Sequence, residues 1–269
     1  MSAKIGIFPA SGALGSSIVN HLAKLVPASD LVLSAQRPEK LHDLKQAGAT
    51  SQDAAIKSGV KYIFYSSLGF GGNLTDQTIA HVMGAHIATE KYLSSLQDKL
   101  SYTIVREGLY TESFPIYTAF FDPQNPVDEV TIPHSGTGPG VACIKRDELG
   151  EASANLIASY VNDPTSFEYS NTAVLLSGSQ EISLVESVEI IGRAIGKPLK
   201  IREISIDEHV KLPQIGDQHT YKGVNPSRDW ATAWDAIRQG EAAIVTPALR
   251  EVLGREPESY ETTVKALFG

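Results

Sequence analysis

The hydrophobic pattern at the start of the chain predicts a strand, a tight turn, a helix and a second strand. Lys4 to Phe8 is a short apolar run, and Pro9 to Gly15 is a turn made mostly of small residues. Ser16 to Val26 has a helical pattern, and a second apolar run covers Leu31 to Ser34. The alternation of short strands with a helix predicts a βαβ unit and therefore a parallel sheet.

The rest of the chain continues this alternation. Strands are predicted at Val60 to Ser66, Leu100 to Arg106, Ala173 to Ser177 and Lys200 to Ser205. Helices are predicted at Pro38 to Ala47, Thr75 to Leu96, Asp147 to Val161, Ser183 to Ile195, Ile206 to Leu212 and Asp229 to Arg238. We therefore expect an α/β fold with a doubly wound, Rossmann-type parallel sheet. Residues 1–115, with 141–180 returning to them, form the expected cofactor domain, and residues 116–140 and 181–269 a smaller α+β part that covers the substrate.

One stretch of the expected sheet is missing after Thr50. Ser51 to Lys57 resembles the tail of a helix, and the strand from Val60 follows at once. A doubly wound sheet has a further strand, helix and strand between these points, about 35 to 40 residues by ordinary element lengths. Either the protein has a real internal deletion, or the sequence as written omits a stretch that the molecule once had. With a deletion, the first strand must pair directly with the strand from Val60 or leave a gap in the sheet.

The predicted helix from Thr75 to Leu96 carries a lysine at an informative position. Thr75 or Asp76 is the expected N-cap, and Ile79, Val82, Met83 and Ile87 mark the apolar face. One further turn beyond Ile87 reaches Lys91, on the line of the buried ridge. The alternative is that Lys91 extends to solvent at the end of the helix.

The small-residue turn has the properties of a phosphate-binding turn. A pyrophosphate must approach the backbone N–H groups at a helix N-terminus, where the helix dipole is positive. Gly12 would allow that approach, and Gly15 would let helix and strand pack closely. Pro9 stands where the usual pattern has its first glycine, and it removes one donor but leaves those of Ser11 to Gly15. The expected contacts with a dinucleotide are Pro9, Ser11, Gly12, Ala13, Leu14 and Gly15.

The residues after the second strand indicate which dinucleotide is bound. An acidic residue there would pair with the ribose hydroxyls of NAD, whereas this chain has Gln36, Arg37 and Lys40. Arg37 and Lys40 suit a 2′-phosphate, which predicts NADP(H). The alternative is that Arg37 to Lys40 is a charged helix start with proline at its first position.

Composition and charge narrow the class of protein. The chain has 269 residues, 42% of them hydrophobic, with a net charge of −8, which argues against nucleic-acid binding through a basic face. No run of 18 apolar residues and no signal-peptide pattern is present, so we expect a cytoplasmic protein with no membrane contact. Cys143 is the sole cysteine, so neither a disulfide framework nor a cysteine metal site is expected.

Several of these features together resemble the NmrA-like proteins, which are atypical short-chain dehydrogenases/reductases. The resemblance rests on the turn Pro9 to Gly15, Arg37, the strand Val60 to Ser67, the segment His86 to Lys91 and the segment Arg106 to Ser113. It covers most of residues 1–200 and is greatest for the NADPH quinone reductase branch. It implies an NADP(H) cofactor and a small-molecule substrate.

The resemblance also assigns residues to the site. Lys91 matches the family lysine that holds the nicotinamide ribose, and Ser66 or Ser67 matches the usual serine. Ser67 and Leu68 should pass near the nicotinamide, and Gly108 belongs to the expected cofactor contacts. The catalytic tyrosine of a typical short-chain dehydrogenase would lie four residues before Lys91, where this chain has Ile87.

The missing tyrosine leaves two main functions open. Isoleucine cannot donate the proton that carbonyl reduction needs, whereas a reduced quinone is resonance-stabilised and takes a proton from solvent or a nearby hydroxyl. His86 or Tyr110 could donate that proton, as could Tyr65, although His86 could instead pair with Glu90 on the helix surface. We therefore expect an NADPH-dependent reductase of a small electron-poor substrate such as a quinone. The alternatives are an NADP(H) sensor that signals to a protein partner without turnover, and a non-redox enzyme of small-molecule biosynthesis.

Overall fold

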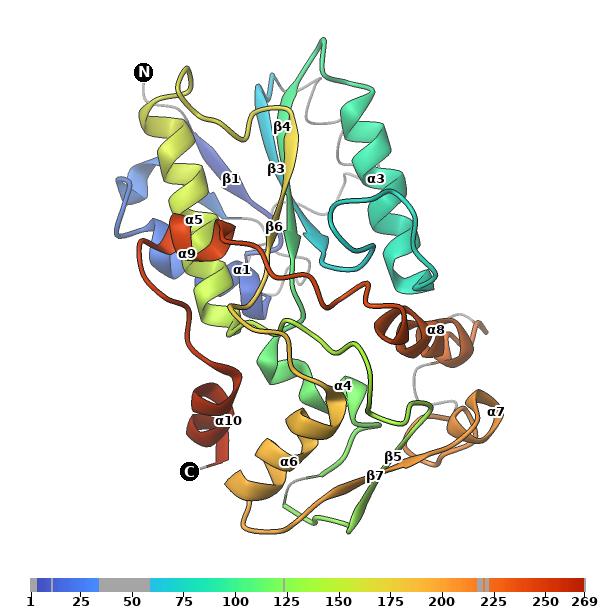
Figure 1. Ribbon diagram of the computed structural model, residues 1–269. Helices are drawn as coiled ribbons and strands as arrows, with labels where there is room; N and C mark the ends of the chain where they lie inside the picture. The colour runs from blue at the N-terminus through green and yellow to red at the C-terminus, as the bar shows by residue number, and fades with distance from the viewer. Residues whose placement is uncertain are drawn as a thin grey trace.

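The computed structural model describes residues 4–10, 12–33, 59–122, 124–216, 220 and 223–268. Its strands are parallel and helices flank them, which confirms the predicted α/β class (Figure 1). The strands are β1 (Ile5–Ile7), β2 (Leu31–Leu33), β3 (Tyr62–Leu68), β4 (Ser101–Glu107), β5 (Glu129–Ile132), β6 (Thr172–Leu176) and β7 (Lys200–Glu203). The α-helices are α1 (Ala13–Leu22), α3 (Gly84–Ser94), α4 (Phe114–Tyr117), α5 (Arg146–Asn162), α6 (Leu184–Ala194), α7 (Ile206–His209), α8 (Ser227–Arg238), α9 (Ala248–Leu253) and α10 (Tyr260–Phe268).

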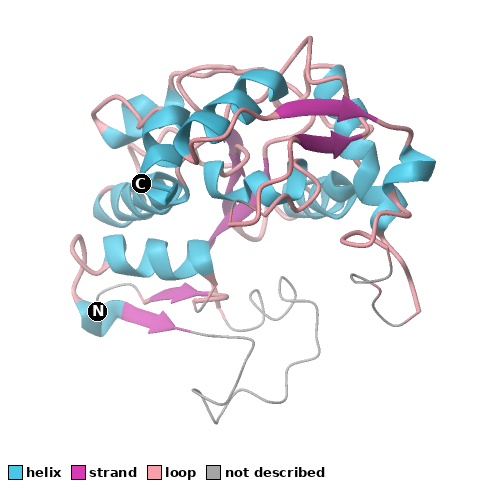
Figure 2. Ribbon diagram, turned by 90° about the horizontal axis from the view of Figure 1, so that it is seen from below, coloured by secondary structure: helices cyan, strands magenta, loops and turns pink. Residues whose placement is uncertain are grey.

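The described strands form three separate parallel groups, seen apart in Figure 2. β1 pairs with β2, β4 lies between β3 and β6, and β5 pairs with β7. The pairing of β3 with β4 runs from Tyr62 opposite Ser101 to Leu68 opposite Glu107. In this register Ser66 and Ser67 lie opposite Val105 and Arg106, so the polar ends of both strands meet at one edge.

The two faces of the β3–β4–β6 sheet are covered by different helices. Val105, Val174 and Leu176 point toward α5, whose buried residues include Leu149 and Leu156. Tyr102 and Ile104 point the other way and pack with Leu93 of α3. α1 packs against α5 on the first face. Because successive side chains of a strand alternate between faces, the last residues of β3 and β4 send side chains to both.

β1 has no hydrogen-bonded partner other than β2 among the described strands. Direct pairing of β1 with β3, one of the two arrangements expected after a deletion, is therefore absent from the described part of the chain. The unit made of β1, α1 and β2 contacts the larger sheet through α5 instead: Gly150 of α5 lies so close that a Cβ atom there would be 2.1 Å from the Ser17 hydroxyl oxygen.

The helix predicted from Thr75 begins later than expected. A 3₁₀ turn covers His81–Met83 and α3 follows from Gly84, so neither Thr75 nor Asp76 is its N-cap. The cause is Glu241, whose carboxylate accepts hydrogen bonds from Gly71 N (3.1 Å), Ile79 N (3.0 Å) and the Thr78 hydroxyl. These contacts hold the chain before His81 as a loop. Ile79 and Val82 are exposed, which contradicts the predicted apolar face, whereas Met83 is fully buried.

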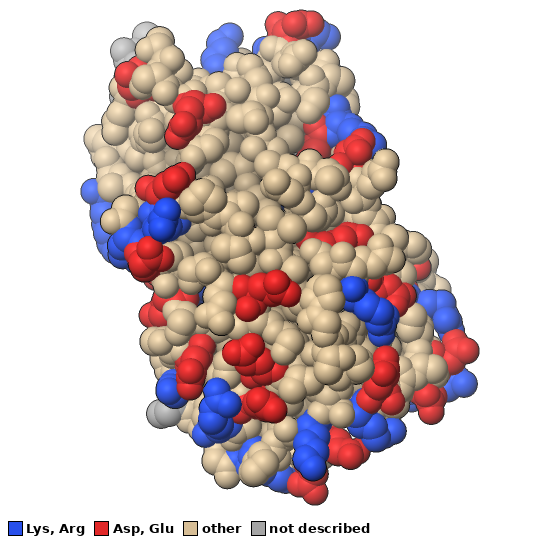
Figure 3. Space-filling view, in the orientation of Figure 1, with Lys and Arg blue, Asp and Glu red and all other residues tan. Residues whose placement is uncertain are grey.

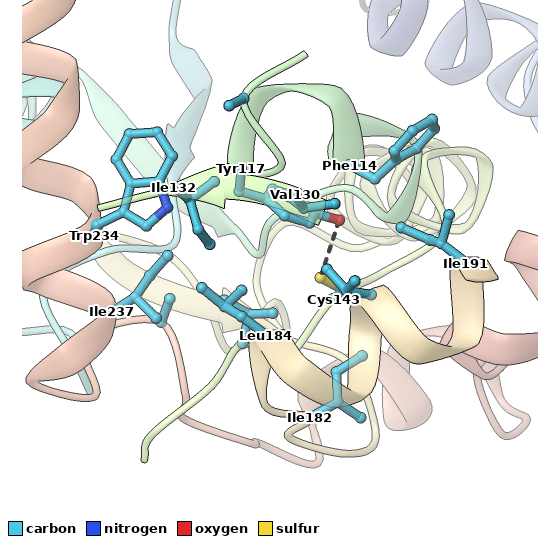
Figure 4. Packing of buried hydrophobic residues seen from close by; sticks show 14 of the residues in the cluster. Phe114, Tyr117, Val130, Ile132, Cys143, Ile182, Leu184, Ile191, Trp234 and Ile237 are labelled. Carbon is cyan, nitrogen blue, oxygen red and sulfur yellow. Dashed lines mark hydrogen bonds between the residues drawn. The ribbon is translucent and has the colours of Figure 1, made fainter. Parts of the chain in front are cut away.

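The largest apolar cluster lies away from the main sheet, between the β5–β7 pair and α4, α6, α8 and α10 (Figure 4). Trp234 and Ile237 of α8 pack there with Leu184 of α6 and Ile132 of β5. Ser183 caps α6: its side chain accepts a hydrogen bond from Glu186 N at the start of the helix. The cluster joins chain segments that lie far apart in the sequence.

The surface carries both signs of charge. On the face shown in Figure 3, basic and acidic side chains are interspersed rather than gathered in a basic patch. Among the described residues, no helix is both long and apolar enough to cross a bilayer.

Candidate functional site

The first turn of α1 is open to a ligand. The helix begins at Ala13, three residues earlier than predicted, and no side chain of a described residue caps it. Ser16 N donates to Gly12 O at 2.8 Å, so the N–H groups of Ala13, Leu14 and Gly15 precede the helical hydrogen-bond ladder. A Cβ atom at Gly15 would lie 1.9 Å from the Pro9 carbonyl oxygen, which confirms the close packing predicted for this glycine.

The turn that is expected to bind phosphate has room around Gly12. A Cβ atom on Gly12 would meet only ordinary contacts, 3.9 Å from the Pro9 ring and 4.0 Å from its carbonyl oxygen. The protein itself therefore does not require glycine here, and the open backbone suits the approach of a phosphate. Ser11, Arg37 and Lys40, the other expected contacts, lie outside the described residues.

Three polar side chains meet where β3 and β4 end, on the face covered by α5. The exposed Ser66 hydroxyl donates to Glu107 Oε1 at 2.8 Å, and the Tyr110 hydroxyl donates to Glu107 Oε2 at 3.0 Å. Glu107 itself is only 2% exposed. We call these three residues the Glu107 cluster. Tyr110 packs against the same apolar cluster as Leu14 of the α1 turn, so the two predicted site elements are neighbours.

The burial of the Glu107 cluster changes its acid–base properties. Burial raises the pKa of Glu107 to about 7, although the hydrogen bonds from Ser66 and Tyr110 favour the ionised form. Burial, together with the nearby Glu107 carboxyl, raises the pKa of the Tyr110 hydroxyl far above its ordinary value. Near neutral pH Glu107 can therefore gain or lose a proton, while Tyr110 remains protonated.

A second polar group lies at the same strand ends on the face covered by α3. Glu90 of α3 accepts from the Ser67 hydroxyl at 2.5 Å and binds the guanidinium of Arg106 at 3.0 and 2.7 Å. All three residues are buried. The charges of Glu90 and Arg106 are paired and the Ser67 hydroxyl proton is used in the hydrogen bond to Glu90, so this group fastens α3 to the sheet.

The residues predicted on α3 lie apart from the Glu107 cluster. Lys91 is 61% exposed and forms an ion pair with Asp76 at 3.1 Å, which confirms the alternative that Lys91 extends to solvent and excludes a place on the buried ridge. His86 hydrogen-bonds with the Tyr65 hydroxyl at 3.0 Å, and burial lowers its pKa. The expected pairing of His86 with Glu90 is also wrong, because Glu90 turns inward to Ser67 and Arg106.

Leu68 and Gly108 are two further predicted cofactor contacts. Leu68 is the last residue of β3, and Gly108 directly follows β4. Leu68 packs against the large apolar cluster, as Ile87 does. Gly108 N donates to Leu176 O at 2.9 Å, and a Cβ atom on Gly108 would lie 3.0 Å from Ile144 Cδ1 and 3.1 Å from two carbonyl oxygens. The structure thus gives Gly108 a packing role between β4 and β6.

A polar hollow lies between the first turns of α1 and α5. Its lining includes Ala13, Ser16, Asn20, Glu112 and Arg146. Arg146 and Glu112 both act electrostatically on the Tyr110 hydroxyl, so the hollow and the Glu107 cluster are close. No group of residues able to hold a metal ion occurs in the described part of the chain.

Sequence reasoning missed the importance of Glu107 and Glu90. A signal was present for Glu107: Arg106 and Glu107 end a strand whose preceding residues are mostly apolar. Two adjacent charged residues on a buried strand must each find partners, one on each face of the sheet. Which face holds which partner depends on the register of β3 and β4.

Known proteins share this architecture. The family model of the NmrA-like family matches residues 19–222. The NmrA-like family domain-containing oxidoreductase flvB of Aspergillus flavus is 27% identical, with 96% of this chain and 93% of that protein covered. This alignment spans 304 positions, more than the 269 residues of this chain, so the relative has residues with no counterpart here.

Two solved structures give the same fold. The NADPH-dependent quinone oxidoreductase of Escherichia coli, solved with NADPH, has a TM-score of 0.73 at 20% identity, with 98% of this chain and 99% of that chain covered. The triphenylmethane reductase of Citrobacter, solved with NADP(H), has a TM-score of 0.67 at 21% identity, with 99% and 100% covered. With the family model matching most of its length, this chain belongs to the NmrA-like family.

Proposed function

We propose that the protein is an NADPH-dependent reductase of a small electron-poor acceptor such as a quinone. The observation that carries the proposal is the open first turn of α1 beside the Glu107 cluster, at the carboxyl end of a parallel sheet. In such sheets ligands bind at the carboxyl ends of the strands, with a phosphate at the helix N-terminus. The flvB relative, named an oxidoreductase, supports the reaction class.

The cofactor supplies a hydride when it is bound, and the described residues would hold and cover it. The N–H groups of Ala13, Leu14 and Gly15 would bind the pyrophosphate, and the cationic Arg146 lies at the hollow beside them. Ser66 is the exposed hydroxyl at the strand ends that would face the reacting groups. Arg37 and Lys40 are proposed for the 2′-phosphate, and residues 116–140 and 181–269 for the cover over the substrate.

Cofactor titration tests this proposal directly. NADPH and NADH are titrated into the purified chain and followed by cofactor fluorescence, with Gly12→Ala as the site variant and Gly6→Ala as its control. A Cβ atom on Gly6 has nothing within 4 Å, so both variants should fold. We expect Gly12→Ala to weaken NADPH binding by roughly tenfold or more, because the added methyl group occupies the phosphate approach. Gly6→Ala should bind as the wild type does, and NADPH should bind tighter than NADH.

Turnover is measured next, as NADPH consumption with a benzoquinone. Consumption that Gly12→Ala slows supports the reductase. Failure of the wild type to bind either dinucleotide would refute the proposal. Binding without consumption would favour the NADP(H) sensor, for which Ile87 in place of the catalytic tyrosine is the specific observation.

A further inference from the structure

Glu107 is a buried acid whose carboxyl group is hydrogen-bonded to an exposed hydroxyl, that of Ser66. Its two carboxyl oxygens each accept one hydrogen bond, from Ser66 at 2.8 Å and from Tyr110 at 3.0 Å. Ser66 is exposed, Tyr110 is partly buried and Glu107 is 2% exposed. A proton that leaves Glu107 toward solvent or a ligand can therefore pass through the Ser66 hydroxyl.

Among the residues that the structure describes, no cationic group pairs with Glu107. Arg106, its neighbour on β4, points to the opposite face and pairs with Glu90 of α3. On the α5 face, Arg146 of α5 and Glu112, which follows β4, act on Tyr110 with opposite signs. Burial without a cationic partner disfavours the carboxylate, and it raises the pKa of Glu107 to about 7.

The proposed reaction lacks a proton donor at the usual place. Ile87 carries no acidic group, Lys91 is exposed and paired with Asp76, and His86 hydrogen-bonds to Tyr65 on the α3 face. Among these candidates and the Glu107 cluster, only the cluster combines a proton that is exchangeable near neutral pH with an exposed hydroxyl at the carboxyl edge of the sheet.

We infer that Glu107 is the proton donor of this protein and delivers its proton through Ser66, an inference that rests on the proposed reductase function. As the acceptor gains a hydride from NADPH, its oxygen becomes an oxyanion. The Ser66 hydroxyl gives its proton to that oxyanion, and Glu107 gives its own proton to the Ser66 oxygen. Glu107 is left as a carboxylate that the Tyr110 hydroxyl stabilises, and a proton from water restores the acid after product leaves. In these terms Ser66 is a catalytic residue, and Glu107 and Tyr110 act through it.

The competing explanation is that the Glu107 cluster only ties the ends of β3 and β4 together. Three variants separate the two explanations: Glu107→Gln, Ser66→Ala and Tyr110→Phe. Glutamine keeps the shape and can still accept a hydrogen bond, so a structural role would survive largely intact. Glu189→Gln is the control, because Glu189 is exposed on α6, far along the chain from the site.

The experiment compares NADPH binding, quinone turnover between pH 5 and 9, and the infrared carboxyl band of the protein without cofactor. For the wild type we expect turnover to fall as the pH rises through about 7 and a protonated carboxyl band to vanish over the same range. Glu107→Gln should bind NADPH as tightly as the wild type and turn over about 100-fold more slowly. Its turnover should no longer fall as the pH rises through this range, and the protonated carboxyl band should be absent. Ser66→Ala should lower turnover and keep the infrared band of the protonated carboxyl. Tyr110→Phe should raise the apparent pKa at which turnover falls with rising pH. Glu189→Gln should match the wild type.

Two results overturn the inference. Wild-type turnover with a rate and pH profile that Glu107→Gln leaves unchanged would refute it alone and leave the reductase function standing. A wild-type chain that does not bind or consume NADPH would refute the proposed function and this inference with it. The folded state of each variant is checked by circular dichroism.

Discussion

At the scale of single residues, the main feature is the buried carboxyl group of Glu107 at the end of β4. Glu107 has its ordinary pKa near 4.5 in an unfolded chain and a pKa of about 7 in the folded protein. The folded state therefore binds a proton that the unfolded state has released between these two values. By linkage, the free energy of unfolding falls as the pH rises through this window.

This gives a prediction about stability. As the pH rises from 4.5 to 7, the free energy of unfolding of the wild type should fall by on the order of 3 kcal/mol through the ionisation of Glu107. Glu107→Gln should not show this fall, because a glutamine does not ionise. Urea unfolding at several pH values measures the difference, with Glu189→Gln as the control. Parallel pH dependences for the wild type and Glu107→Gln would show that Glu107 does not have the raised pKa.

At the scale of elements, a distant carboxylate decides where α3 begins. The sequence pattern predicts that the helix begins at Thr75, but the chain before His81 is a loop. Glu241, just after α8, accepts hydrogen bonds from Gly71 N, Ile79 N and the Thr78 hydroxyl. Backbone donors that are held by a carboxylate do not need a helix to satisfy them. A contact about 160 residues away along the chain therefore overrides the local propensity.

The same contact predicts the effect of its removal. Glu241→Ala leaves the two backbone donors and the Thr78 hydroxyl without their shared acceptor and should lower the free energy of unfolding by about 2–4 kcal/mol. Glu189→Ala, which removes an exposed glutamate whose side chain makes no hydrogen bond within the described residues, should change the free energy of unfolding by less than about 0.5 kcal/mol. Urea unfolding of the two variants measures both values. Equal losses would mean that Glu241 is not what holds the loop.

At the scale of the whole molecule, the described strands do not form one continuous sheet. β1 and β2 have three residues each and hydrogen-bond only to one another among the described strands, whereas β4 is paired on both edges. Elements with few backbone partners open at a lower free energy than the global unfolding transition.

Hydrogen exchange should reveal this division. We expect the amides of β1 and β2 to exchange roughly tenfold or more faster than those of β4 and β6, because in the described part of the chain no hydrogen-bonded strand joins them to the larger sheet and their attachment is by packing on α5. Addition of NADPH should slow exchange in β1 and α1 and leave β5 and β7 unchanged. Equal protection of β1 and β4 in the absence of cofactor would contradict the division.

The sequence by itself determined the parallel α/β class, most strand and helix positions and the tight turn before α1, because these depend on hydrophobic periodicity and on small residues close together in the chain. It also carried the resemblance to the NmrA-like family, which the family model confirms. The close packing at Gly15 was predictable for the same local reason.

Only the tertiary structure decided the start of α3, the exposure of Lys91 and the partners of Glu90 and Glu107. The Glu241 contact and the register of β3 against β4 both join residues that are far apart in the sequence. A local pattern does not fix whether a charged residue at a strand end meets water, a counter-ion or two hydroxyl groups. That outcome depends on which elements pack over each face of the sheet, and within the described residues it gives Glu107 two hydroxyl partners and no cationic one.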